Sequence, residues 1–125
     1  MQIQRTVFSA VGVVALLTGA TLVEAADTFR KLTGPEIRAR LPGMEITDEA
    51  HWAHQYMADG SVKTFSMGRS QVGKWQVKGA ELCVEYPKEE LECSEVWLSG
   101  KEVEFRQPGR SYNFEGVLQK QTPRS

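Results

Sequence analysis

The sequence is poor in the residues and motifs on which most catalytic sites depend. Its 125 residues include only two cysteines and two histidines. It has neither a G-x-G-x-x-G nor a G-x-x-x-x-G-K-[ST] loop for a nucleotide phosphate, and no G-x-S-x-G elbow for a serine nucleophile. Acidic residues are so frequent that a carboxylate pair would not be diagnostic of glycoside chemistry. The sequence therefore predicts a non-enzymatic protein without a cofactor.

Neither sign of charge dominates. The chain has 15 basic and 16 acidic residues, a formal net charge of −1. A nucleic-acid-binding domain usually shows a strong basic excess or a basic stripe with interleaved aromatic residues, and this sequence has neither. We expect no nucleic-acid partner.

Long apolar runs are also missing, and the one apolar segment lies at the N-terminus. Arg5 precedes the apolar run 7–17, which is shorter than the roughly 20 residues of a spanning helix. Small residues follow and end in Val23-Glu24-Ala25, the pattern that a signal peptidase reads. We predict cleavage after Ala25, export to a bacterial periplasm and no stable membrane insertion. An uncleaved anchor is the less favoured alternative.

The two cysteines are expected to form a disulfide, because an oxidising compartment favours a bridge for an even pair. Cys83 and Cys93 have a C-x9-C spacing, unlike the C-x-x-C of redox enzymes, and no second cysteine pair could complete a zinc site. The bridge would close a short loop and contribute about 2–3 kcal/mol. Strand alternation predicts that it joins two strands on the outer face of a hairpin.

One short helix is predicted over residues 34–41. Thr33 and Glu36 form a capping-box pattern, and Pro42-Gly43 ends the helical segment. The expected organisation is a signal peptide at 1–25, an N-terminal arm at 26–31, one domain at 32–120 and a flexible tail at 121–125.

The remainder of the domain shows strand-length alternation between closely spaced turn signals. Evenly spaced short strands are typical of an antiparallel meander, and curling into a barrel removes its exposed edges. We therefore predict a mainly β fold of seven or eight strands in a small barrel, with the helix capping one end. The expected strands are 44–47, 51–57, 61–67, 72–77, 81–86, 91–98, 101–106 and 112–119.

Aromatic residues supply the candidate binding surface. On a strand, Trp52, His54 and Tyr56 share one face. Together with Trp75 and Trp97 they are the candidate ligand or contact residues, although most aromatic side chains of a small β domain form its core. Trp97 shares a face with Cys93, so it either packs beside the bridge or marks a contact surface.

A metal site is the alternative use of the histidines. His51, His54 and Asp48 lie within one short segment. A zinc site needs at least three well-placed ligands, and His51 and His54 point to opposite faces if the segment is a strand. A hydrogen-bonded histidine in an aromatic barrel interior is therefore favoured.

The order of motifs resembles that of small exported bacterial proteins with a lipocalin-like or calycin-like β-meander. The motifs are LTGPEIRARLPGM, ADGSV, GKWQVKGAELCVEY and VWLSGKEVEF, and they include a G-x-W at Gly73–Trp75. The resemblance implies fold and location. We accordingly expect an exported binding domain for a small apolar ligand or a protein partner. A periplasmic metal-binding protein that uses His51 and His54 is the alternative, and an enzyme of unknown type is the third.

Overall fold

A computed structural model describes residues 10–15, 19, 28–111 and 113–124 of the chain. The predicted signal peptide and its cleavage point lie largely outside these residues and stay predictions. Among the residues described, none of the helices is long and apolar enough to cross a membrane.

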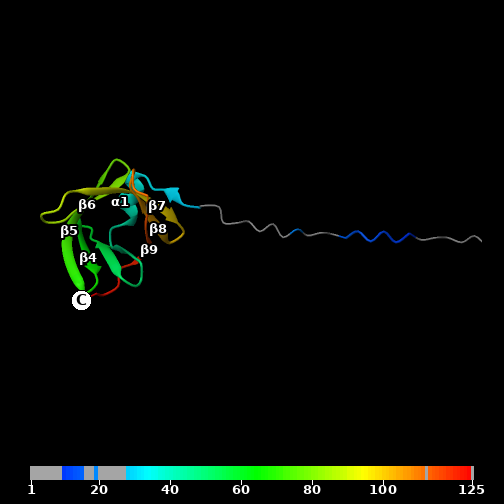
Figure 1. Ribbon diagram of the computed structural model, residues 1–125, viewed down its shortest axis with the longest axis horizontal. Helices are drawn as coiled ribbons and strands as arrows, with labels where there is room; N and C mark the ends of the chain where they lie inside the picture. The colour runs from blue at the N-terminus through cyan, green and yellow to red at the C-terminus, as the bar shows by residue number, and fades with distance from the viewer. Residues whose placement is uncertain (1–9, 16–18, 20–27, 112, 125) are drawn as a thin grey trace, which may run out of the picture.

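Eight antiparallel strands close into a barrel, as the sequence predicts. Each of these strands pairs with its neighbours in chain order, and the barrel closes because β9 also pairs with β2. Figure 1 shows the ribbon of the barrel, with α1 and β4 to β9 labelled. The strands are β2 (Met44–Thr47), β3 (Trp52–Tyr56), β4 (Ser61–Ser66), β5 (Arg69–Lys78), β6 (Glu81–Glu85), β7 (Glu92–Ser99), β8 (Glu102–Arg106) and β9 (Phe114–Lys120).

An additional strand, β1 (Arg30–Lys31), precedes the barrel within the segment predicted to be an arm. It pairs with β7 through Arg30↔Leu98 and Lys31↔Trp97. β6 pairs with β7 only as far as Glu95, so β1 covers the part of the β7 edge that β6 leaves open. Two residues of alternation are too few for the sequence to predict such a strand.

The predicted helix is confirmed as α1 (Gly34–Arg40), with both halves of its capping box. The Thr33 hydroxyl accepts a hydrogen bond from the Glu36 amide, and the Glu36 carboxylate accepts one from the Thr33 amide. The helix lies at the barrel end where β3 stops, since the Gly43 amide beyond it donates to the Tyr56 carbonyl. Leu32, Ile37 and Leu41 are fully buried there. They form one core with Ile46, Tyr56, Val62, Leu82, Val96, Leu98 and Val103.

The predicted disulfide is present between Cys83 and Cys93. The two residues are directly opposite each other in the β6–β7 hairpin, whose connection spans 86–91. Both point away from the barrel interior, because Leu82 and Val84 take the inward positions. Cys83 is nevertheless completely buried, so the bridge is better shielded from water than the expected solvated outer face.

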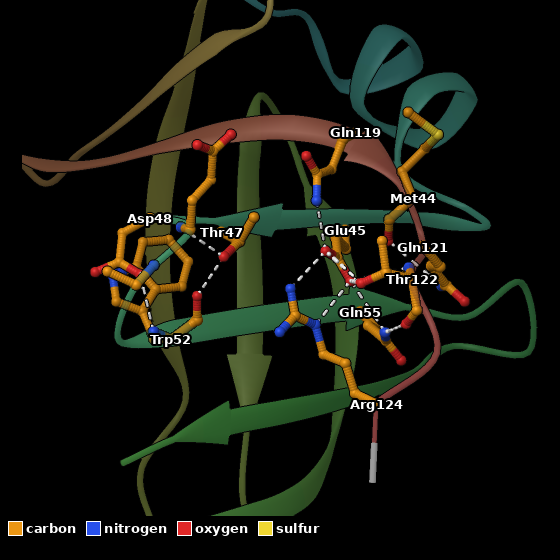
Figure 2. A network of polar contacts seen from close by, with 12 residues as sticks. Met44, Glu45, Thr47, Asp48, Trp52, Gln55, Gln119, Gln121, Thr122 and Arg124 are labelled. Atoms are coloured by element: carbon orange, nitrogen blue, oxygen red, sulfur yellow. Dashed lines mark hydrogen bonds and ion pairs between the residues drawn. The ribbon is translucent and has the colours of Figure 1, made fainter. Parts of the chain in front are cut away.

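Within the predicted tail at 121–125, residues 121–124 make hydrogen bonds to the barrel. Residues 121–124 cross the outside of the barrel and bond to β2 and β3 (Figure 2). The Thr122 carbonyl accepts a hydrogen bond of 2.8 Å from the Gln55 amide group, and Arg124 forms an ion pair with Glu45 at 2.9 Å. A polar and proline-containing segment lacks periodicity, so the sequence gives no signal for this attachment.

Candidate functional site

The barrel has a cavity at the end opposite α1, which we call the mouth. It lies where β6 and β8 end and β7 and β9 begin, and its volume is about 170 Å³. Inward-facing side chains of the strands make its walls, and the β8–β9 connection makes part of its rim. The lining residues are His54, Tyr56, Leu82, Val84, Tyr86, Glu92, Ser94, Phe105, Gln107, Arg110 and Phe114.

Glycine at two inward positions makes room for aromatic rings in the barrel. A Cβ atom at Gly73 would lie 2.7 Å from the Tyr86 ring and 2.6 Å from the Glu85 carbonyl oxygen. A Cβ atom at Gly116 would lie 3.0 Å from the Trp52 ring. The Tyr86 ring therefore lies directly against the β5 backbone, which leaves the centre of the mouth open.

His54 is the most unusual group in the cavity. Its ring stacks obliquely on Trp52, with centroids 4.8 Å apart, and meets the edge of Tyr56 at 6.5 Å. Across residues 28–111 and 113–124, its ring nitrogens find no hydrogen-bond partner. Burial lowers the pKa of His54 to about 4, so the imidazole is uncharged at neutral pH. A neutral imidazole offers one donor and one acceptor to a ligand.

Two tyrosines add hydroxyl groups to the interior. Burial raises the pKa of Tyr56 far above its usual value, and the neighbouring Tyr86 adds to this. Burial also raises the pKa of Tyr86, although a hydrogen bond with Thr64 acts in the opposite direction. Both phenols are therefore protonated at neutral pH, and the inner cavity contains no ionised group from these side chains.

Charge is confined to the rim, where it is paired. Arg110 donates to the Glu92 carboxylate at 2.8 Å, and Gln107 donates to the Ser94 hydroxyl at 3.0 Å. Both contacts join the β8–β9 connection to β7. The Glu92 and Arg110 side chains are 63% and 44% exposed, so this ion pair is on the surface of the mouth.

The predicted ligand or contact residues separate into three environments. His54 and Tyr56 line the cavity. Trp52 and Trp75 pack against the core beside them, and the Trp75 indole donates to the Met57 carbonyl at 2.9 Å. Trp97 is on the outside of the barrel, where the Arg106 guanidinium lies 4.0 Å from its ring centre. The five side chains thus do not form one surface.

The predicted metal residues also separate. Asp48 accepts hydrogen bonds from the backbone amides of His51 and Trp52, and its carboxylate contacts the His51 ring at 3.0 Å. Burial alone would raise the pKa of the Asp48 carboxylate. The hydrogen bonds from these amides outweigh burial, so the pKa is lowered. His51 is 69% exposed and borders a different surface hollow from the cavity that His54 lines. In the described parts of the chain, no three His, Cys, Asp or Glu side chains come together as a metal site would require.

Several lining residues were not among the predicted site residues. Tyr86, Phe105 and Phe114 appear in the sequence as ordinary core aromatics, and Glu92 and Arg110 as surface charges. The feature that identifies them as lining residues is their position at the strand ends of a closed barrel. Identifying the mouth requires the strand register and the end on which α1 lies, and neither can be deduced from local spacing.

Comparison of the chain with protein-family models, curated proteins and solved structures found no match.

Proposed function

We propose that this chain is an exported, non-enzymatic binding protein that takes a small, largely apolar molecule into the mouth of its barrel. The observation that carries the proposal is the cavity itself. It combines aliphatic and aromatic walls with a few polar groups, including an imidazole that has no hydrogen-bond partner among the described residues. Small-molecule sites are commonly built this way. A dry apolar cavity of about 150 Å³ holds a benzene-sized molecule, so a volume of about 170 Å³ suits one ring or a short chain.

Export to the periplasm is part of the proposal. The N-terminal sequence has the features of a signal peptide, and a disulfide is compatible with an oxidising compartment. The interior of an eight-stranded barrel can hold one small ligand, and this agrees with the proposed use of the cavity.

The other uses considered for this chain receive less support. Arg106 and Glu95 contact Trp97, the candidate for a protein interface, so the chain's own side chains partly cover it. His51 and His54 lie on different surfaces, which leaves a shared metal without a ligand set.

A matched pair of valine substitutions tests the proposal. Val84 faces the cavity, whereas Val72 is 57% exposed on a neighbouring strand. Val84→Phe fills the cavity, and Val72→Phe makes the same chemical change outside it. With toluene as the probe, we expect amide chemical-shift changes around the mouth in the wild type and in Val72→Phe. These changes should be lost in Val84→Phe. Equal responses in all three proteins, or none in the wild type, would contradict the proposal.

A further inference from the structure

We propose that the ligand is an uncharged, single-ring aromatic compound bearing a hydroxyl group, and that this hydroxyl binds the imidazole of His54. The inference rests on the proposed function and adds the chemical class of the ligand. Three properties of the mouth support it: the size and shape of the cavity, the pairing of its charges and the His54 ring, whose nitrogens have no hydrogen-bond partner among the described residues.

The size and the walls favour a ring. The cavity of about 170 Å³ is bounded by the rings of Tyr56, Tyr86, Phe105 and Phe114. Aromatic rings attract one another in edge-to-face and offset arrangements, and each such pair contributes beyond the area that it buries. An aliphatic molecule of the same size would fill the space without these contacts, so the walls discriminate in favour of an aromatic ligand.

The charges exclude an ionised ligand. The rim carboxylate of Glu92 and the guanidinium of Arg110 are 2.8 Å apart and neutralise each other. A ligand anion that approached Arg110 would meet Glu92, and a ligand cation that approached Glu92 would meet Arg110. Either ligand would also lose its hydration without an unpaired opposite charge inside the cavity. An uncharged ligand avoids both costs.

The imidazole supplies the polar recognition. His54 lies between strand partners Ile46 and Thr64, and the described residues satisfy neither of its ring nitrogens. His54 is partly buried and lines the open cavity, and its nitrogens are not among the fully buried unpartnered atoms of the described residues, so a ligand or a water molecule can reach them there. A hydroxyl can donate and accept, and therefore matches either tautomer of the ring. A ligand with one hydroxyl would satisfy His54 and leave the rest of the ring for the apolar walls.

The test compares phenol with toluene, two probes of similar size that differ in the hydroxyl. We would measure the affinities of both for the wild type, His54→Leu and His54→Phe. Loss of the hydrogen bond should reduce the affinity for phenol relative to toluene by about tenfold in both variants. His51→Leu, at the exposed histidine outside the cavity, should leave the ratio unchanged. Two substitutions of different volume are used so that the test does not depend on the folding of one variant.

Benzoate and benzylamine, added at pH 7, separate this inference from the proposed function. If either ion binds more tightly than phenol and loses binding in Val84→Phe, the uncharged class is wrong while the cavity remains a binding site. If the ratio of phenol to toluene affinity does not change in the His54 variants, the role of His54 is wrong. If none of the four probes binds the wild type, both the inference and the proposed function fail.

Discussion

Glu45 and His54 come from adjacent, paired strands, Glu45 fully buried and His54 partly buried, and their surroundings are opposite. On the outside of the barrel, Glu45 is 0% exposed and accepts hydrogen bonds from Gln55, Gln119, Thr122 and Arg124 (Figure 2). Burial alone would raise the pKa of Glu45, but Arg124 and the amide donors outweigh it and hold the pKa at about 2. On the inside, nothing offsets the burial of His54, and its pKa is lowered to about 4.

The comparison distinguishes a side chain that stabilises the fold from one that is placed to bind a ligand. A buried charge with every oxygen satisfied fixes the position of the groups around it, and here it attaches the C-terminal segment to the barrel wall. The His54 ring packs against Trp52 and Tyr56, but its nitrogens gain no hydrogen bond from the described residues on folding. Such a group is expected where a ligand completes the hydrogen bonding. The outer face of the two strands is therefore structural, whereas His54 on the inner face belongs to the proposed binding site.

The largest effect should follow from removing the carboxylate. Glu45→Ala would leave the Arg124 guanidinium and the partly buried Gln119 amide group without this acceptor, and the buried Gln55 amide group with the Thr122 carbonyl alone. We expect the free energy of unfolding to fall by about 3 kcal/mol. Glu85→Ala, on an exposed part of β6, is the control and should change it by less than about 0.5 kcal/mol. Urea unfolding measures both. Similar values for the two variants would show that the network adds no stability.

The second-largest expected effect is the pH dependence of stability that His54 causes. The unfolded state takes up a proton near pH 6.5, whereas the folded state does so only near pH 4. Between these values the unfolded state binds more protons, so stability should fall as the pH is lowered through the window. The expected loss is roughly 3 kcal/mol, from about 1.4 kcal/mol per pKa unit.

Urea unfolding between pH 7 and pH 4 tests this loss against His54→Phe. The variant has no ionisable ring at this position and should lose less stability over the same interval. Tyr56, Tyr86, Glu92 and Arg110 face the same cavity and are present in both proteins. Below pH 4.5 the protonation of Glu45 should destabilise both, because its folded pKa is depressed to about 2. Parallel pH profiles between pH 6.5 and 4.5 would contradict the burial of His54.

Backbone packing around the mouth gives a smaller effect. Gly73→Ala would place a methyl group 2.6 Å from the Glu85 carbonyl oxygen and force the Tyr86 ring toward the cavity. We expect destabilisation of about 2 kcal/mol and weaker binding of toluene. Gln71→Ala, at an exposed position of the same strand, should alter neither. Calorimetry and probe titration measure the two effects. Unchanged binding would mean that Tyr86 does not shape the cavity.

The surroundings of Glu45 and His54 also show which features of the fold and of the candidate site the sequence could predict. The capping box at Thr33 and Glu36, the alternating strands and the cysteine pair are local patterns, and each predicts its element correctly. The placement of His54 on an aromatic inner face follows from the same alternation. The cavity that it shares with residues of β6, β8 and β9 depends on barrel closure, which no local pattern encodes. The contacts of Glu45 also escape local patterns, since Thr122 and Arg124 lie 77 and 79 residues after Glu45 in the chain.

The smallest effect tests whether burial, rather than contact distance, distinguishes the two ion pairs. Arg110–Glu92 and Arg124–Glu45 have nearly equal distances, 2.8 and 2.9 Å, but the glutamate side chains are 63% and 0% exposed. Exposed pairs contribute little and are screened by salt. Arg110→Ala should therefore change the free energy of unfolding by less than about 0.5 kcal/mol.

The same substitution should have a clearer kinetic effect, because it removes one of the two contacts that join the β8–β9 connection to β7. Toluene should exchange faster from Arg110→Ala than from the wild type, as measured by NMR line shapes. Arg40→Ala, in α1 at the other end of the barrel, is the control and should exchange at the wild-type rate. High salt should move the wild type toward the variant. A loss of stability as large as that of Glu45→Ala would show that the rim pair holds the fold together, and that exposure does not separate the two pairs.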